Sequence, residues 1–193
     1  MLILRDNGVV YLSYGVCSSL CSGCADDGWA FHEENAYFWR APNDDDIIVS
    51  AVGCGFESSL FRYDKNLVSG ELTEANLLFE VIPRLKKTLS RYGKLRKNGN
   101  MNCAFLFAQR ERVYKVTTGY ACEEVEEYDA LGRGGFLALS AFRTSGHLPP
   151  EERLAFAETM IARGLGEPLC PQLVINTKTM KPYLLTPKTN PQG

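Results

Sequence analysis

The order in which two kinds of hydrophobic periodicity follow one another constrains this fold more than any other feature. Apolar residues recur with a period of about two in strand-like segments and about 3.6 in helix-like segments. We predict four strands, two helices, further strands, two more helices and two final strands. A doubly wound parallel sheet needs strands and helices that alternate one by one, so this order favours an α+β fold with antiparallel sheets between helical layers.

The first half of the chain is predicted to contain two hairpins. Asn7-Gly8 lies between two apolar runs, and both residues tolerate the positive φ of a type I′ turn. The segment Pro42–Asp46 is rich in turn-forming residues and separates the second pair of strands. The four predicted strands are Leu2–Arg5, Val9–Leu12, Ala36–Arg40 and Ile47–Val52.

The predicted helices have recognisable ends. Thr73 is placed as an N-cap, Gly93 as a stop, and Pro83 is expected to bend or break the helix that contains it. Pro150 starts the last helix and Gly164 is expected to end it. The helices are predicted at about Glu57–Tyr63, Leu72–Tyr92, Gly135–Phe142 and Pro150–Arg163.

Length and composition predict one domain. With 193 residues, of which 45% are hydrophobic, the chain is long enough for one packed core and short for two. We assign residues 1–187 to this domain and 188–193 to a polar tail. Its remaining strands are predicted at Cys103–Phe107, Arg112–Thr117, an acidic piece around Val125, Gln172–Asn176 and Pro182–Leu185.

Charge and targeting signals exclude several classes of protein. The formal net charge of −2 gives no bulk attraction to nucleic acid or to an anionic membrane. The chain has no apolar run of membrane-spanning length, and Met1–Asp6 lacks the features of a signal peptide, so we expect a cytoplasmic protein. In that reducing compartment the seven cysteines are expected to be free thiols or metal ligands.

Several local stretches, in this order, resemble the proteasome subunit family, including its simpler bacterial peptidase relatives. The stretches are Asn7–Leu12, Asp46–Gly53, Asp129–Gly135 and Pro149–Leu154. The resemblance implies the N-terminal-nucleophile (Ntn) hydrolase fold, a four-layer αββα sandwich of two antiparallel sheets between helices. It also implies a homo-oligomer that associates through its helical layers.

The resemblance identifies where catalytic residues would stand. Active members expose an N-terminal threonine whose hydroxyl attacks the peptide carbonyl, while a lysine and an aspartate tune its amine. Here Met1 opens the first strand, and the positions of the aspartate and the lysine fall near Gly15 and Ala36. Arg133 replaces a serine that the family usually carries between two glycines. We therefore expect no catalytic residues and interpret these positions as a vestigial active-site region: Met1, Gly15, Ala36, Gly132, Arg133 and Gly134.

A cysteine-rich loop keeps other possibilities open. Cys17, Cys21 and Cys24 have the C-x3-C-x2-C spacing that binds an iron–sulfur cluster in radical S-adenosylmethionine enzymes. Zinc would need a fourth ligand, for which His32 is the nearest candidate. His32 is also a candidate base for a Cys17 nucleophile. We prefer an ordinary loop without a cofactor, because the spacing occurs without the context of those enzymes.

Two functional classes follow. The first is a catalytically silent proteasome-like protein that acts through self-assembly or a protein partner. The second is an enzyme: a divergent Ntn-type or cysteine-dependent hydrolase, or a metal-dependent protein. Two charged runs, Lys86–Lys97 and Cys122–Glu127, are interpreted as solvated surfaces, and the acidic run is alternatively a partner for the basic run of a neighbouring subunit.

Overall fold

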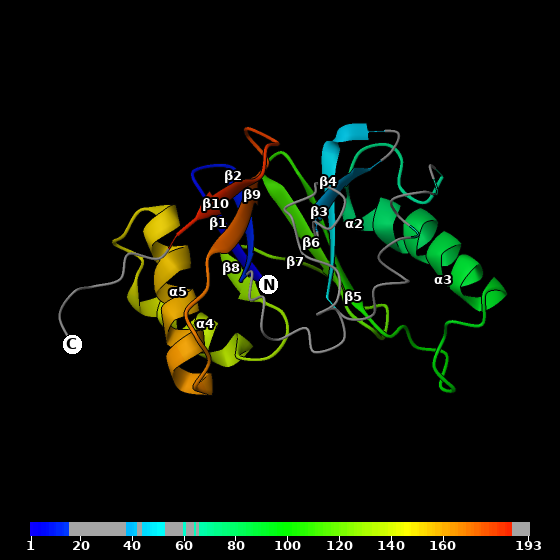
Figure 1. Cartoon of the computed structure of the whole chain (residues 1–193). Coiled ribbons are helices and arrows are strands. Elements are labelled where there is room, and N and C mark those ends of the chain that lie inside the picture. The colour runs from blue at the N-terminus through cyan, green and yellow to red at the C-terminus, as the bar shows by residue number, and fades with distance from the viewer. Residues whose placement is uncertain (16–37, 42–43, 53–59, 61–63, 65, 187–193) are drawn as a thin grey trace. The chain divides into compact units, whose positions relative to one another are not determined.

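The computed structural model describes residues 1–15, 38–41, 44–52, 60, 64 and 66–186. They form two antiparallel sheets of five strands each (Figure 1). The chain divides into two compact units, each of which contains one sheet with its helices. The first unit consists of Met1–Asn7, Tyr11–Ala36 and Glu127–Gly193, and the second of Gly8–Val10 and Tyr37–Glu126.

The first unit packs two antiparallel helices on its sheet. The strand order is β10-β9-β2-β1-β8. Helices α4 (Gly135–Thr144) and α5 (Pro150–Leu165) bury apolar side chains against it. The strands are β1 (Leu2–Asp6), β2 (Val9–Gly15), β8 (Tyr128–Ala130), β9 (Gln172–Asn176) and β10 (Tyr183–Leu185). The shared core contains Leu2, Leu4, Ala138, Ala141, Phe142, Leu154, Ala157 and Val174.

The second unit has the strand order β3-β4-β5-β6-β7. One face of its sheet is covered by a long helical element whose buried residues include Leu77, Leu85 and Leu89. The strands are β3 (Phe38–Ala41), β4 (Asp44–Val52), β5 (Ala104–Gln109), β6 (Arg112–Val116) and β7 (Cys122–Glu124). The helical element consists of α2 (Glu74–Asn76), the π-helix η2 (Leu77–Val81) and α3 (Ile82–Arg91).

The long helical element agrees with the prediction and explains how it contains a proline. Thr73 is the N-cap, and its Oγ1 accepts a hydrogen bond of 3.1 Å from the Asn76 amide. Gly93, with φ of 63°, follows the C-cap residue Tyr92. Pro83 lies in the first turn of α3, directly after the π-helical turn. Because proline cannot donate a hydrogen bond and its ring crowds the carbonyl four residues earlier, the wider turn accommodates it without ending the element.

The first hairpin is as predicted, whereas the second has a shorter turn. Asn7 and Gly8 have φ values of 47° and 75°, and β1 and β2 are neighbours in the sheet. The expected turn at Pro42–Asp46 is wrong in extent, since β4 begins at Asp44, which pairs with Ala41. Backbone pairing with β3 thus overrides the low strand propensity of the aspartates.

Two other predicted boundaries are wrong. The strand predicted around Val125 is misplaced, since β7 ends at Glu124 and β8, which belongs to the other sheet, begins at Tyr128. Helix α5 continues through Gly164 to Leu165, and Gly166, with φ of 67°, follows it. Gly164 is needed for close packing instead, because a Cβ there would lie 2.5 Å from Leu137 Cδ1 of α4.

Some predictions concern residues or relations that the structure does not describe. The expected helix at 57–63 lies outside the described residues except for Leu60. The tail at 188–193 lies wholly outside them. The four-layer order and the single domain over residues 1–187 stay predictions, while two antiparallel sheets with helices are observed.

Candidate functional site

One end of the sheet in the first unit gathers segments that are far apart in the sequence. The last residue of β2, Gly15, pairs with Gln172 at the start of β9. Met1 and Leu131 continue the pairing of β1 with β8 by one residue. The Met1 nitrogen donates a hydrogen bond to Leu131 O at 3.1 Å, and the Met1 carbonyl oxygen accepts one from Leu131 N at 2.9 Å. The start of β1 therefore lies at the same end of the sheet as Gly15 and Gln172.

Helix α5 adds a carboxyl group to this end. Gln172 Nε2 donates to Glu158 Oε2 at 3.4 Å and to the backbone oxygen of Leu154 at 3.2 Å. A Cβ at residue 15 would overlap Glu158 Oε1, so the absence of a side chain at Gly15 makes room for the carboxyl group. We refer to Met1, Gly15, Glu158 and Gln172 as the strand-end cluster.

Burial shifts the two titratable groups of the strand-end cluster towards their neutral forms. It lowers the pKa of the Met1 amine below 8.0, and the charge of Glu158 partly offsets this. Burial likewise raises the pKa of Glu158 above 4.5, against the opposing effects of the Gln172 hydrogen bond and of the Met1 amine. Both shifts have the same physical cause, since burial disfavours the charged form of each group.

A buried hydroxyl lies in the strand that carries Gly15. Ser13 is fully buried, two residues before Gly15 and therefore on the same face of β2. Among the described residues, neither Ser13 Oγ nor Gln172 Oε1 has a hydrogen-bond partner. The face of the sheet under α5 thus contains two unsatisfied oxygens close to the end of β2.

The glycine-rich turn after β8 begins one residue beyond Leu131. Gly132 and Gly134 have φ values of 94° and 83°, which explains why both are glycine. A Cβ at Gly134 would also lie 2.9 Å from Ile161 Cγ2. The side chain of Arg133 is 73% exposed and pairs with Glu167 at 3.1 Å, so it forms a surface ion pair.

The structure brings together part of the predicted vestigial region. Met1 and Gly15 are both in the strand-end cluster, and the turn of Gly132, Arg133 and Gly134 follows directly after Leu131. The role of these residues stays a prediction. The other predicted site residues lie outside the described part of the chain: Cys17, Cys21, Cys24, His32 and Ala36.

Sequence reasoning missed Glu158 and Gln172. A signal for Glu158 was present, since it lies four residues after Leu154 and three before Ile161 and therefore on the inner face of the helix. An acidic residue at such a position is uncommon unless it has a partner. Gln172 had no such signal, because a polar residue at the start of a strand is ordinary.

The cysteines that the structure describes differ in state. Cys103 and Cys122 are not in disulfides: Cys103 is a buried thiol, and burial, Glu74 and Glu123 raise the pKa of Cys122 to about 11. Cys122 is therefore a poor nucleophile at neutral pH. Cys170 is disulfide-bonded, so the expectation of thiols or ligands throughout is wrong for this residue. Composition could not reveal which sulfur atoms the fold brings together.

Two kinds of feature are absent from the described residues. No group of three or more His, Cys, Asp or Glu residues in this part of the chain is arranged to hold a metal ion. No helix in the described ranges is long and apolar enough to cross a bilayer.

Comparison with known proteins rests on structure, because no protein-family description and no curated protein matches the chain. BPH from Thiobacillus denitrificans superposes with a TM-score of 0.68 at 17% identity, over 97% of this chain and 98% of that one. It has also been solved in complex with epoxomicin. The fold is proteasome-like.

Two further proteasome-like structures agree with this assignment. Anbu, an ancestral β-subunit from Yersinia bercovieri, has a TM-score of 0.59 at 13% identity and covers 98% of this chain and 87% of its own. Eukaryotic HslV from Trypanosoma brucei has a TM-score of 0.53 at 13% identity, over 91% and 97% of the two chains. These proteins are of the Ntn type, and at such identities the likeness concerns the fold alone.

Proposed function

We propose that this protein is a proteasome-subunit-like protein without threonine-peptidase activity, which acts through self-assembly or by binding a protein partner. The observation that carries the proposal is the residue at the start of β1. The proteasome-like fold predicts a threonine hydroxyl at this position, and the chain has the thioether of Met1. A thioether has no proton to lose and cannot attack a carbonyl group in this way.

The surroundings of Met1 support the same proposal. The carboxyl group of Glu158 lies within electrostatic reach of the amine, whereas the resembled family is expected to place a lysine nearby. Gly15 offers no side chain at the expected aspartate position, and Arg133 is paired with Glu167 at the surface. Burial lowers the pKa of the Met1 amine, as a general base requires, but the nucleophile and its partners differ in kind from those of the resembled family.

The proposal can be tested with epoxomicin, the compound bound to BPH in a solved structure. The purified full chain is incubated with epoxomicin and its intact mass is measured, together with hydrolysis of fluorogenic peptides. We expect an unchanged mass and no hydrolysis above that of buffer. A covalent adduct that maps to the N-terminal residue of the purified chain would contradict the proposal.

The alternatives based on the cysteine loop stay predictions. They are a hydrolase with Cys17 and His32 as nucleophile and base, and a zinc or iron–sulfur site at Cys17, Cys21 and Cys24. Elemental analysis of anaerobically purified protein tests the metal site directly. Alkylation of the thiols with iodoacetamide before the peptide assay tests the hydrolase.

A further inference from the structure

Charge is distributed unevenly along this chain. Residues 74–100 contain seven of the 21 Lys and Arg residues but only two of the 23 Asp and Glu residues, a formal charge of +5. The rest of the chain therefore carries −7, since the whole chain carries −2. The small net charge conceals a basic segment, formed by the helical element and the loop after it, in an otherwise acidic protein.

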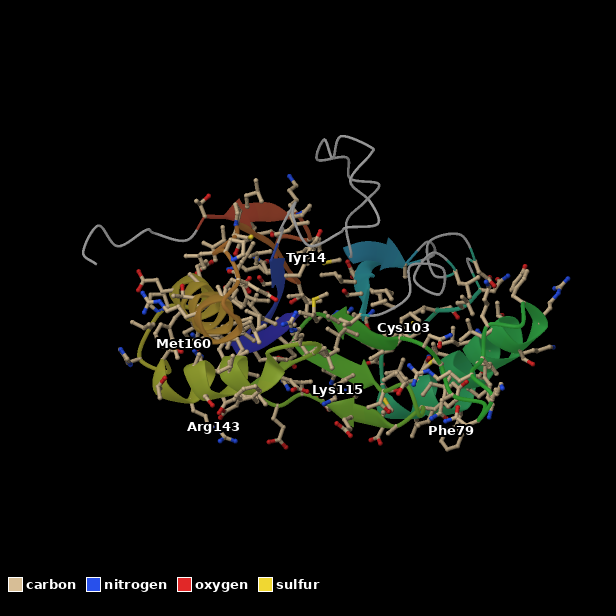
Figure 2. The ribbon with its side chains drawn as sticks, turned by 60° about the horizontal axis from the view of Figure 1, so that its bottom comes forward. Tyr14, Phe79, Cys103, Lys115, Arg143 and Met160 are labelled. Carbon is tan, nitrogen blue, oxygen red and sulfur yellow. The ribbon has the colours of Figure 1, made fainter. Side chains whose placement is uncertain are left out.

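The basic residues share an uncovered helix face with an aromatic ring. Phe79, Pro83, Lys87 and Arg91 recur every four residues and are all exposed. The opposite face of α3 buries Ile82, Leu85 and Leu89. Phe79 is 75% exposed and projects away from the helix (Figure 2). We call Phe79, Pro83, Lys87 and Arg91 the basic face.

The cations of the basic face have no ion-pair partner within the described residues. Nearby cations do have partners: Arg84 pairs with Glu80 at 2.5 Å, and Lys86 lies 5.1 Å from the centre of the Tyr120 ring. No such contact involves Lys87 or Arg91 in the part of the chain that the structure describes. The two cations are thus available to a binding partner.

A surface of opposite charge lies along strand β7 and the residues that follow it in the chain. Strand β7 is an edge strand, and the run from Glu123 to Glu127 has four exposed glutamates. Glu123 pairs with Lys115 at 3.0 Å, whereas the carboxylates of Glu126 and Glu127 have no partner among the described residues. We call Glu123, Glu124, Glu126 and Glu127 the acidic edge.

We infer that the basic face of one subunit binds the acidic edge of a second copy of the same chain. Both surfaces have unpaired charges of opposite sign, so a second copy satisfies each of them. Because the two surfaces differ, each copy can bind one neighbour through its basic face and another through its acidic edge, and such a head-to-tail arrangement generates a ring if the rotation closes. This inference rests on the self-assembly proposed above and names the two surfaces that form its interface.

Reversed charges provide the test. The subunit number of the wild-type full chain is measured by sedimentation at about 50 mM and about 500 mM salt, and we expect association to weaken at least about tenfold at the higher concentration. The variants Lys87→Glu with Arg91→Glu, and Glu126→Lys with Glu127→Lys, should each fail to associate. An equimolar mixture should associate again, because every contact then joins opposite charges.

A matched control separates this effect from a change in total charge. Lys178→Glu with Lys181→Glu makes the same change in net charge at two exposed residues between β9 and β10, and should leave association intact.

A wild-type oligomer that is unaffected by the reversal at Lys87 and Arg91 would overturn this interface and leave self-assembly standing. A wild type that is monomeric at both salt concentrations would overturn both. Binding of a DNA or RNA oligonucleotide by the monomer, abolished by that reversal, would assign the basic face to a polyanion instead.

Discussion

At the scale of single residues, Gly134 shows why the turn beside the strand-end cluster needs a glycine. Its φ of 83° and the closeness of Ile161 both exclude a side chain. We expect Gly134→Ala to destabilise the protein by about 1–3 kcal/mol in urea unfolding. Gly146→Ala is the matched control, because nothing lies within 4 Å of a Cβ there and its φ is not positive. Equal stabilities of the two variants would contradict this account of the turn.

Glu158 makes stability depend on pH. Because burial raises its folded-state pKa above 4.5, the folded state holds the proton more tightly than the unfolded state does. The contribution of Glu158 to stability is thus complete below 4.5 and is lost as pH rises through the folded-state pKa. A glutamine at this position does not titrate. We expect the stability of Glu158→Gln relative to wild type to increase from about pH 4 to about pH 7.

This pH dependence is measured by urea unfolding of both proteins across that range. Glu152→Gln, an exposed position on the same helix, controls for the loss of one carboxylate. A difference between wild type and Glu158→Gln that stays constant with pH would show that the Glu158 carboxyl group is not destabilised by burial.

At the scale of elements, the helical element of the second unit depends on its cap. Thr73 Oγ1 accepts from the Asn76 amide, and the first α-helical segment is only Glu74–Asn76 before the π-helical turn. We expect Thr73→Ala to cost about 1 kcal/mol of unfolding free energy and Thr73→Ser to retain most of it. Thermal unfolding followed by circular dichroism measures both. A Thr73→Ser variant as unstable as Thr73→Ala would show that packing of the methyl group, not the hydrogen bond, matters.

The bounds of helices, strands and turns could be predicted where the sequence signal for them lies within a few neighbouring residues. The Asn7-Gly8 turn and the Thr73 cap rest on contacts within a few residues, so both were predicted. The end of α5 was misplaced because Gly164 has a tertiary role, close packing on Leu137 of α4. That β7 and β8, only three residues apart, belong to different sheets depends on which distant strands pair with each of them, which local patterns do not encode.

At the scale of the whole molecule, the distribution of charge matters more than its total. A net charge of −2 predicts little, whereas +5 on residues 74–100 and −7 elsewhere favour association between unlike surfaces. Such association weakens with salt, because exposed ion pairs are screened. The likeness to solved structures concerns the fold alone, so any charged contact is decided by this chain's own residues.

The sequence by itself determined the kinds and order of the elements, because hydrophobic period, caps and turn residues act over a few positions. It also determined that a methionine, without a hydroxyl, stands at the start of β1. Only the tertiary structure decided that Glu158 and Gln172 join Met1 and Gly15 at one end of a sheet. The strand-end cluster unites segments more than 140 residues apart, and pairing over such distances depends on the packing of the whole unit.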